Sequence, residues 1–150
     1  MFVSNGNNDR LELNTVKAYD HVANEWSYMP KMIIRRENHK SVAIKNKLFV
    51  VGGCSRDGGK TCEVFDSTCN MFLLLKPNLA SVGFYFSYLS EVIALGSKLV
   101  VFSNYNKNIL CYDLEFDKWS EIPFEVTYYL KGFHCAKLPQ LYHANEVNII

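Results

Sequence analysis

The sequence lacks the features that mark membrane, secreted and nucleic-acid-binding proteins. No apolar run approaches the ~18 residues of a membrane span, and the opening MFVSNGNNDR has neither the basic region nor the apolar core of a secretion signal. The 16 basic and 15 acidic residues are interspersed, without the clustered Lys and Arg that bind nucleic acid or an acidic membrane. We therefore expect a soluble, cytoplasmic protein with no nucleic-acid or membrane partner.

Signs of catalysis and of metal binding are equally scarce. The five cysteines include no C-x-x-C pair, and the four histidines stand at no zinc-finger spacing from a cysteine pair. No G-x-S-x-G or H-E-x-x-H motif occurs. In a reducing compartment, such cysteines are small hydrophobic residues of strands and turns. The sequence predicts no enzyme, no metal and no cofactor.

One segment comes close to a nucleotide-binding motif. LFVVGGCSRDGGKT at 48–61 ends in the Gly-Lys-Thr of a P-loop, but the first glycine of that motif should stand where the sequence has Cys54. Gly53 is one residue too early, and the following TCEVFDST alternates like a strand where a helix should begin. We interpret the segment as a turn between two strands.

What the chain does contain is a repeat. Three phrases align: VKAYDHVANEW at 16–26, CEVFDSTCNMF at 62–72 and ILCYDLEFDKW at 109–119, spaced by 46 and then 47 residues. Each phrase has an aromatic residue before Asp and a second aromatic residue seven positions after the first. The aromatic–Asp pairs are Tyr19-Asp20, Phe65-Asp66 and Tyr112-Asp113, and the spaced aromatic residues are Trp26, Phe72 and Trp119.

The repeated phrase predicts a β-hairpin. Its first strand alternates, and Asp and Asn suit the turn because their side chains bond the backbone and tolerate unusual dihedral angles. The second aromatic residue opens the return strand and packs against the neighbouring unit. Pro30 and Pro123 stand four residues past a tryptophan. Proline is accepted at the end of an edge strand, where no donor is needed.

A second phrase precedes the hairpins. SVAIKNKLFVVGG at 41–53 and EVIALGSKLVVFSN at 91–104 each give two short apolar strands around a tight polar turn. The opening MFVSNG aligns with the end of this phrase, so that Ser4-Asn5 and Ser103-Asn104 match Gly52-Gly53, and the N-terminus looks cut within a unit. Each unit then has four antiparallel strands within about fifty residues. This pattern predicts an all-β fold made of β-propeller blades.

The best unit resembles the Kelch repeat. It contains Arg36, His39, LFVVGG at 48–53, Phe65-Asp66 and Phe72, and the resemblance extends over nearly the whole chain. The double glycine is replaced in the other units, and Phe72 stands where the family has tryptophan. WD40 repeats have a similar period but need G-H and W-D dipeptides, which do not occur here. The spacing looks most like the Kelch domain of BTB-Kelch (Kelch-like) proteins.

The resemblance implies an incomplete propeller at 1–138. It would consist of a partial blade at 1–30, full blades at 31–77 and 78–124, and the start of another at 125–138, followed by an irregular tail at 139–150. Kelch propellers usually close with about six blades, and about three are present here. We therefore expect a fragment of a longer protein, or two chains that close one ring as a dimer.

In a propeller, function sits on the loops at the rims. The connections from second to third strand and from blade to blade emerge on one rim, and they contain residue types that dominate protein interfaces. The candidate partner-binding residues are Arg35, Arg36, Arg56, Asp57, Lys60, Tyr85, Tyr105 and Tyr128. For Arg36 the resemblance also offers a structural role between blades.

The resemblance implies a protein-interaction module. In Kelch-like adaptors the propeller captures a substrate protein for ubiquitination, while a BTB domain, missing from these 150 residues, docks the cullin of an E3 ligase. The alternative is a scaffold associated with actin and the cytoskeleton, with no ligase role.

Overall fold

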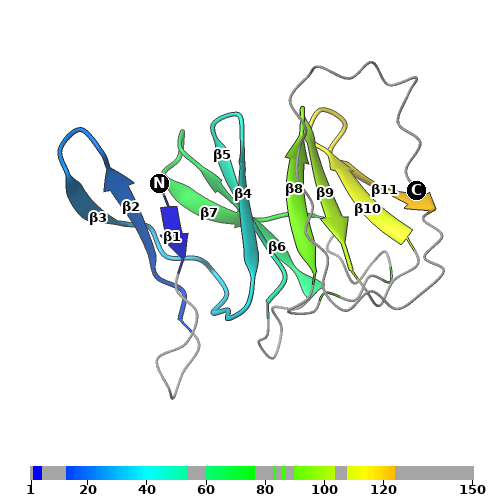
Figure 1. The fold of residues 1–150 in the computed structure, drawn as a ribbon, viewed down its shortest axis with the longest axis horizontal. Coiled ribbons are helices and arrows are strands. Elements are labelled where there is room, and N and C mark those ends of the chain that lie inside the picture. The colour runs from blue at the N-terminus through cyan, green and yellow to red at the C-terminus, as the bar shows by residue number, and fades with distance from the viewer. Residues whose placement is uncertain are drawn as a thin grey trace, which may run out of the picture.

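The computed structural model describes residues 13–53, 60–76, 90–103 and 108–123, the backbone of 2–4, and the single residues Gly83 and Phe86. Regular structure in these ranges consists of short β-strands joined by turns (Figure 1). None of it forms a helix that could cross a bilayer. The segments predicted at 125–138 and 139–150 lie outside the described residues.

The strands form three antiparallel sheets. The first sheet contains β1 (Phe2–Ser4), β2 (Val16–Asp20) and β3 (Glu25–Met29). The second sheet contains β4 (Lys40–Ile44), β5 (Lys47–Val51), β6 (Cys62–Asp66) and β7 (Met71–Leu74). The third sheet contains β8 (Glu91–Leu95), β9 (Lys98–Phe102), β10 (Asn108–Asp113) and β11 (Lys118–Pro123). The prediction of an all-β fold with four-stranded antiparallel units is confirmed.

Each sheet ends in a hairpin whose turn has the same chemistry. The aspartate that ends the first strand accepts a hydrogen bond from the backbone N–H two residues on, at 2.8 Å for Asp20 and 2.9 Å for Asp66 and Asp113. The last turn residue has a left-handed backbone, and it is Asn or Asp, which tolerate that conformation better than other side chains. These residues are Asn24, Asn70 and Asp117, with φ of 55°, 52° and 50°.

The aromatic residues of the repeat face each other across the hairpin. Tyr19 pairs with Trp26, Phe65 with Phe72 and Tyr112 with Trp119 in the strand register. The ring centroids are 5.1, 5.3 and 5.1 Å apart with interplanar angles of 44°, 49° and 47°, within the range of favourable tilted pairs. The spacing of seven residues therefore gives the same cross-strand contact three times.

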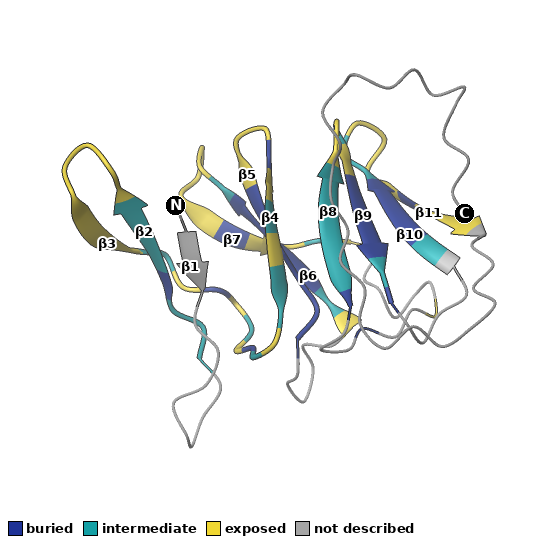
Figure 2. Cartoon of the chain, in the orientation of Figure 1, coloured by how far each residue is buried: buried dark blue, intermediate teal, exposed yellow. Residues whose placement is uncertain are grey.

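The sheets lie side by side, and their facing surfaces form the core (Figure 2). Val16 of the first sheet packs with Leu48, Val50, Phe65 and Phe72 of the second. A larger cluster joins the second sheet to the third, and its members are Ile44, Phe49, Val51, Cys62, Val64, Phe86, Leu99, Val101, Leu110, Tyr112 and Trp119. One aromatic pair in each of these two junctions is thus buried against the preceding sheet, whereas β3 of the first sheet is mostly exposed.

The register of β1 corrects one detail of the sequence alignment. Ser4 pairs with Val16 in the first sheet as Val51 pairs with Cys62 in the second. Val16 and Cys62 both stand three residues before the repeat aromatic, so Ser4 corresponds to Val51 and not to the first residue of Gly52-Gly53. The predicted match of Ser4-Asn5 was wrong by one residue. A strand of three residues has too little pattern to fix its register from sequence, although one residue of slip reverses its faces.

Burial of the aromatic pair predicts different costs for two equivalent tryptophans. Trp119 is 5% exposed and Trp26 is 47% exposed. Trp119→Ala should lower the free energy of unfolding by about 3–5 kcal/mol, because it removes a buried ring from a packed junction. Trp26→Ala, the matched control, should cost clearly less. Urea unfolding monitored by circular dichroism measures both, and equal costs would show that burial does not distinguish the two positions.

Candidate functional site

The double glycine at the end of β5 brings two parts of the chain close together. Gly52 and Gly53 have φ of 64° and 100°, which side chains rarely allow. A Cβ atom on Gly52 would lie 2.1 Å from the ring of Phe86, and one on Gly53 would lie 2.7 Å from the carbonyl oxygen of Glu37. The segment leaves β5 and returns as β6, antiparallel to it. It therefore joins two strands, as predicted, and does not open a helix as a P-loop does.

The Arg36 side chain lies against the backbone at the two ends of the β5–β6 connection. Its Nη1 donates to the carbonyl oxygens of Gly52 at 2.6 Å and Thr61 at 3.2 Å, and its Nη2 donates to Thr61 Oγ1 at 2.9 Å. Nε and Nη2 also donate to Glu63 Oε1 at 3.1 and 2.8 Å. Both charged side chains of this ion pair are fully buried. The threonine of the apparent P-loop thus serves as an acceptor for an arginine.

Glu63 connects the ion pair to the segment between the first two sheets. Its Oε2 accepts from the N–H of Ile33 at 2.6 Å, and its Oε1 accepts from the N–H of Ile34 at 3.0 Å. The same segment is held to the residues just before β2, because the Arg36 N–H donates to the Leu13 carbonyl oxygen at 3.0 Å. Burying two charges is costly unless their hydrogen-bonding capacity is used. Here the hydrogen bonds that satisfy the two charges also fix the path of the chain between the first and second sheets.

The prediction that Arg36 contacts a partner therefore needs correction. Its side chain is buried, so it is not available to a partner, and the structural alternative describes it better.

Burial and the nearby Arg36 charge lower the pKa of His39 to about 4. Burial raises the pKa of Cys62 to about 12, which keeps this thiol protonated and unreactive.

Two of the candidate partner-binding residues are exposed. Arg35, next to buried Arg36, is exposed, and Lys60 is exposed just before β6. Arg35 belongs to the connection between β3 and β4, and Lys60 stands at the end of the connection between β5 and β6. The other candidates lie outside the described residues, and they are Arg56, Asp57, Tyr85, Tyr105 and Tyr128.

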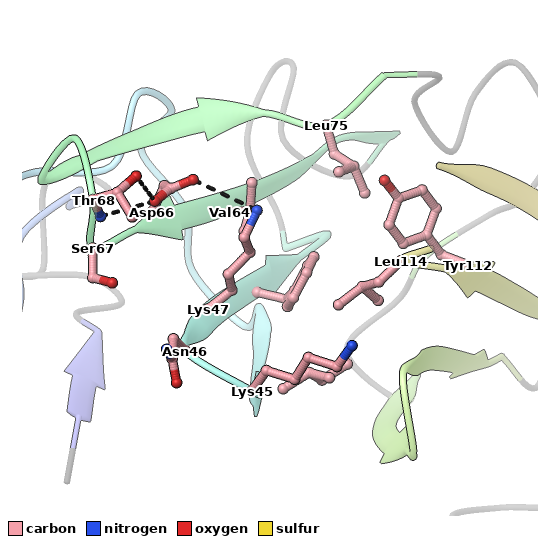
Figure 3. Close-up of a pocket in the computed structure, with 12 residues that line it drawn as sticks. Lys45, Asn46, Lys47, Val64, Asp66, Ser67, Thr68, Leu75, Tyr112 and Leu114 are labelled. Atoms are coloured by element: carbon pink, nitrogen blue, oxygen red, sulfur yellow. Dashed lines mark hydrogen bonds and ion pairs between the residues drawn. The ribbon is translucent and has the colours of Figure 1, made fainter. Parts of the chain in front are cut away.

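A cleft that the sequence did not predict lies between the second and third sheets (Figure 3). Its volume is about 470 Å³. Its lining comes from β4, β5 and the turn between them, from β6 and the β6–β7 turn, from the residue after β7, and from β10 and the residue after it. The lining residues are Ile44, Lys45, Asn46, Lys47, Phe49, Val64, Asp66, Ser67, Thr68, Leu75, Tyr112 and Leu114. In the described part of the chain, no three His, Cys, Asp or Glu side chains gather as a metal site.

The buried ion pair predicts a large effect of removing its cation. Arg36→Met should lower the free energy of unfolding by about 3–5 kcal/mol, because it leaves the Glu63 carboxylate buried without its partner. The control is Lys98→Met, which removes an ion pair to Asp113 at 3.2 Å on the surface and should cost at most about 1 kcal/mol. Chemical denaturation measures both, and a cost for Arg36→Met no larger than the control would contradict the role of the pair.

The low pKa of His39 predicts a loss of stability in mild acid. The folded protein favours the neutral imidazole, since the pKa falls from 6.5 to about 4. The contribution of His39 to stability is therefore complete above pH 6.5 and is lost as the pH falls toward 4. Urea unfolding at several pH values should show this slope, and His39→Gln should flatten it. His21→Gln, in an exposed turn, is the control, and an unchanged slope in His39→Gln would refute the assignment.

Comparison with known proteins adds to this geometry. The Kelch motif family model matches residues 35–70, from the segment that holds Arg36 to the β6–β7 turn. Kelch-like protein 7 of Rattus norvegicus is 30% identical over 113 residues, which are 71% of this chain and 18% of that protein. Kelch-like protein 25 of Xenopus tropicalis is 28% identical over 121 residues, 70% of this chain and 20% of that protein.

A plant protein shows the same similarity. An F-box/kelch-repeat protein of Arabidopsis thaliana is 26% identical over 102 residues, which cover 68% of this chain and 27% of that protein. The chain thus spans about a fifth to a quarter of the length of these curated relatives. The motif match, the relatives and the repeated four-stranded sheets agree. The chain belongs to the Kelch-repeat family, as a partial propeller.

Proposed function

We propose that this chain is the substrate-binding part of a Kelch-like adaptor for a cullin-based E3 ubiquitin ligase, acting in the cytoplasm. Kelch repeats form protein-interaction modules, and the motif at 35–70 is of this kind. The observation that carries the proposal is the contrast between two neighbouring arginines. Arg36 is buried in its ion pair with Glu63, whereas Arg35 is exposed on the connection between β3 and β4.

The exposed connections are the part of the chain that suits a partner. The buried strand residues of the repeat pack between sheets, so they are not available to a partner. Arg35 and Lys60 are exposed cations, and arginine is among the residue types that dominate binding energy at interfaces. A substrate surface that presents carboxylates would complement them. The proposed role is binding, with the chemistry of ubiquitin transfer supplied by other proteins.

Recruitment of the ligase would need a separate part. In the proposed adaptor a BTB domain contacts the cullin, and the Kelch repeats hold the substrate. Kelch-like protein 7 is similar to this chain over 18% of its length, so a longer protein of that kind has ample room for such a domain. A cytoskeletal scaffold that binds actin is the alternative, and the experiment below distinguishes the two.

The proposal predicts substrates whose capture depends on the exposed cations. The chain is immobilised and used to capture cytoplasmic proteins. The control variant is Lys118→Glu, which reverses the charge of an exposed strand residue and should capture the same proteins as the unchanged chain. Arg35→Glu combined with Lys60→Glu should lose at least about tenfold of the signal for true substrates, because two attractive charges become repulsive. Quantitative mass spectrometry measures the difference.

The ligase role is tested in cells on the proteins that meet this criterion. Their half-lives should lengthen when the gene that encodes the chain is silenced, and inhibition of cullin activation should have the same effect. Unchanged half-lives would reject the adaptor role. Co-sedimentation of the purified chain with actin filaments, together with unchanged half-lives, would favour the scaffold.

A further inference from the structure

The cleft between the second and third sheets has a polar and an apolar side. Asp66, Ser67 and Thr68 lie on one side, and Leu75 and Leu114 lie on the other beside the ring of Tyr112 (Figure 3). A volume of about 470 Å³ is within the range of pockets that bind ligands. The cleft therefore has room for an apolar side chain against one wall and a polar group near the other.

Lys45 at the cleft has an unfavourable backbone conformation. Its φ is 53° at the first position of the β4–β5 turn. Gly96 is its counterpart in the third sheet, because Ile44 pairs with Lys47 around the β4–β5 turn as Leu95 pairs with Lys98 around the β8–β9 turn. Gly96 has φ of 61° at no steric cost. A long charged residue stands where the other sheet has glycine, and an unfavourable backbone of this kind is a reason to look for function.

The charges at the cleft leave the Lys45 ammonium group the most available. Asp66 already accepts from the Thr68 hydroxyl at 2.6 Å and N–H at 2.9 Å, and it pairs with Lys47 at 3.5 Å. Lys45 is 64% exposed, and its ion pair with Glu115 is long, at 3.7 Å. The carboxylate of a ligand can therefore compete with Glu115 for Lys45, whereas a positively charged ligand would be repelled by Lys45 and Lys47.

We infer that this cleft is a second protein-binding site, which takes a short acidic peptide segment of a partner protein. The carboxylate of the segment pairs with Lys45, and an adjacent aliphatic side chain packs against Leu75 and Leu114. The occupant is a peptide because the charged and apolar parts of the cleft are adjacent, as they are in consecutive residues of a chain. Two cations line the cleft, Lys45 and Lys47, and Lys47 already pairs with Asp66 at 3.5 Å. The lining therefore suits the single carboxylate of a peptide better than a phosphate-rich ligand, which needs several available cations.

This site is distinct from the connections that carry Arg35 and Lys60. The β4–β5 and β6–β7 turns belong to the edge of the molecule formed by the short hairpin turns, which is the upper edge in Figure 1. A partner could thus bind the cleft while a substrate occupies the other edge. The inference does not need the ligase role, and its failure would leave the proposed function unaffected.

The test uses the whole 150-residue chain and two synthetic peptides. One is the acetylated, amidated pentapeptide Gly-Leu-Glu-Leu-Gly, and the other has Gln in place of Glu. Amide chemical shifts are recorded by NMR during titration to millimolar peptide. The acidic peptide should shift the amides of 45–47, 66–68 and 114, and the neutral peptide should bind at least about threefold more weakly, the value of one exposed charge pair.

Variants separate a binding role of Lys45 from a structural one. Lys45→Gly should weaken the acidic peptide by about threefold or more, yet leave the thermal midpoint unchanged or higher, because glycine relieves the left-handed backbone. Lys45→Arg should retain binding, and Glu115→Gln should strengthen it by removing the competing carboxylate. Lys118→Ala, which removes an exposed lysine elsewhere, should bind like the wild type. Equal shifts with both peptides, no shifts, or unaltered binding by Lys45→Gly would overturn the inference.

Discussion

The frame of this chain depends on one buried ion pair. Arg36 and Glu63 have no exposed side-chain surface, so each must satisfy its charge from groups inside the protein. Arg36 does so on the backbone that leaves β5 and enters β6, and Glu63 does so on the segment that arrives from the first sheet. Together they fix where one sheet stops and the next begins.

The two junctions between sheets solve the same problem with different chemistry. Glu63 and Leu110 hold equivalent positions, two residues before the aromatic members of their pairs, Phe65 and Tyr112. Leu110 belongs to the larger apolar cluster, which includes Phe49 and Trp119. The junction with the ion pair has the smaller apolar cluster. Directional bonds thus position the sheets where apolar packing is limited, and close packing does so where it is extensive.

Much of the fold could be predicted from the sequence, because the repeat contains its own checks. The aspartate, the left-handed Asn or Asp and the spaced aromatic residue all point to one hairpin, and local signals that agree are reliable. The site was harder to predict. Arg35 and Arg36 are adjacent and alike in sequence, and only the acceptors around Arg36 separate their roles. The cleft joins Lys45 to Leu114, a contact between different units that no single repeat reveals.

The difference between the junctions bears on how such a chain can evolve. Repeats arise by duplication, and identical units could be exchanged, lost or added without harm. In this chain, a unit with Leu110 in place of Glu63 would leave an arginine like Arg36 without its carboxylate, and Glu63 placed in the apolar cluster would lack donors. Each unit has become specific to its place in the order. Recombination between the units is then constrained. A repeat can be added or lost only if the residues that form the junctions with its neighbours change as well.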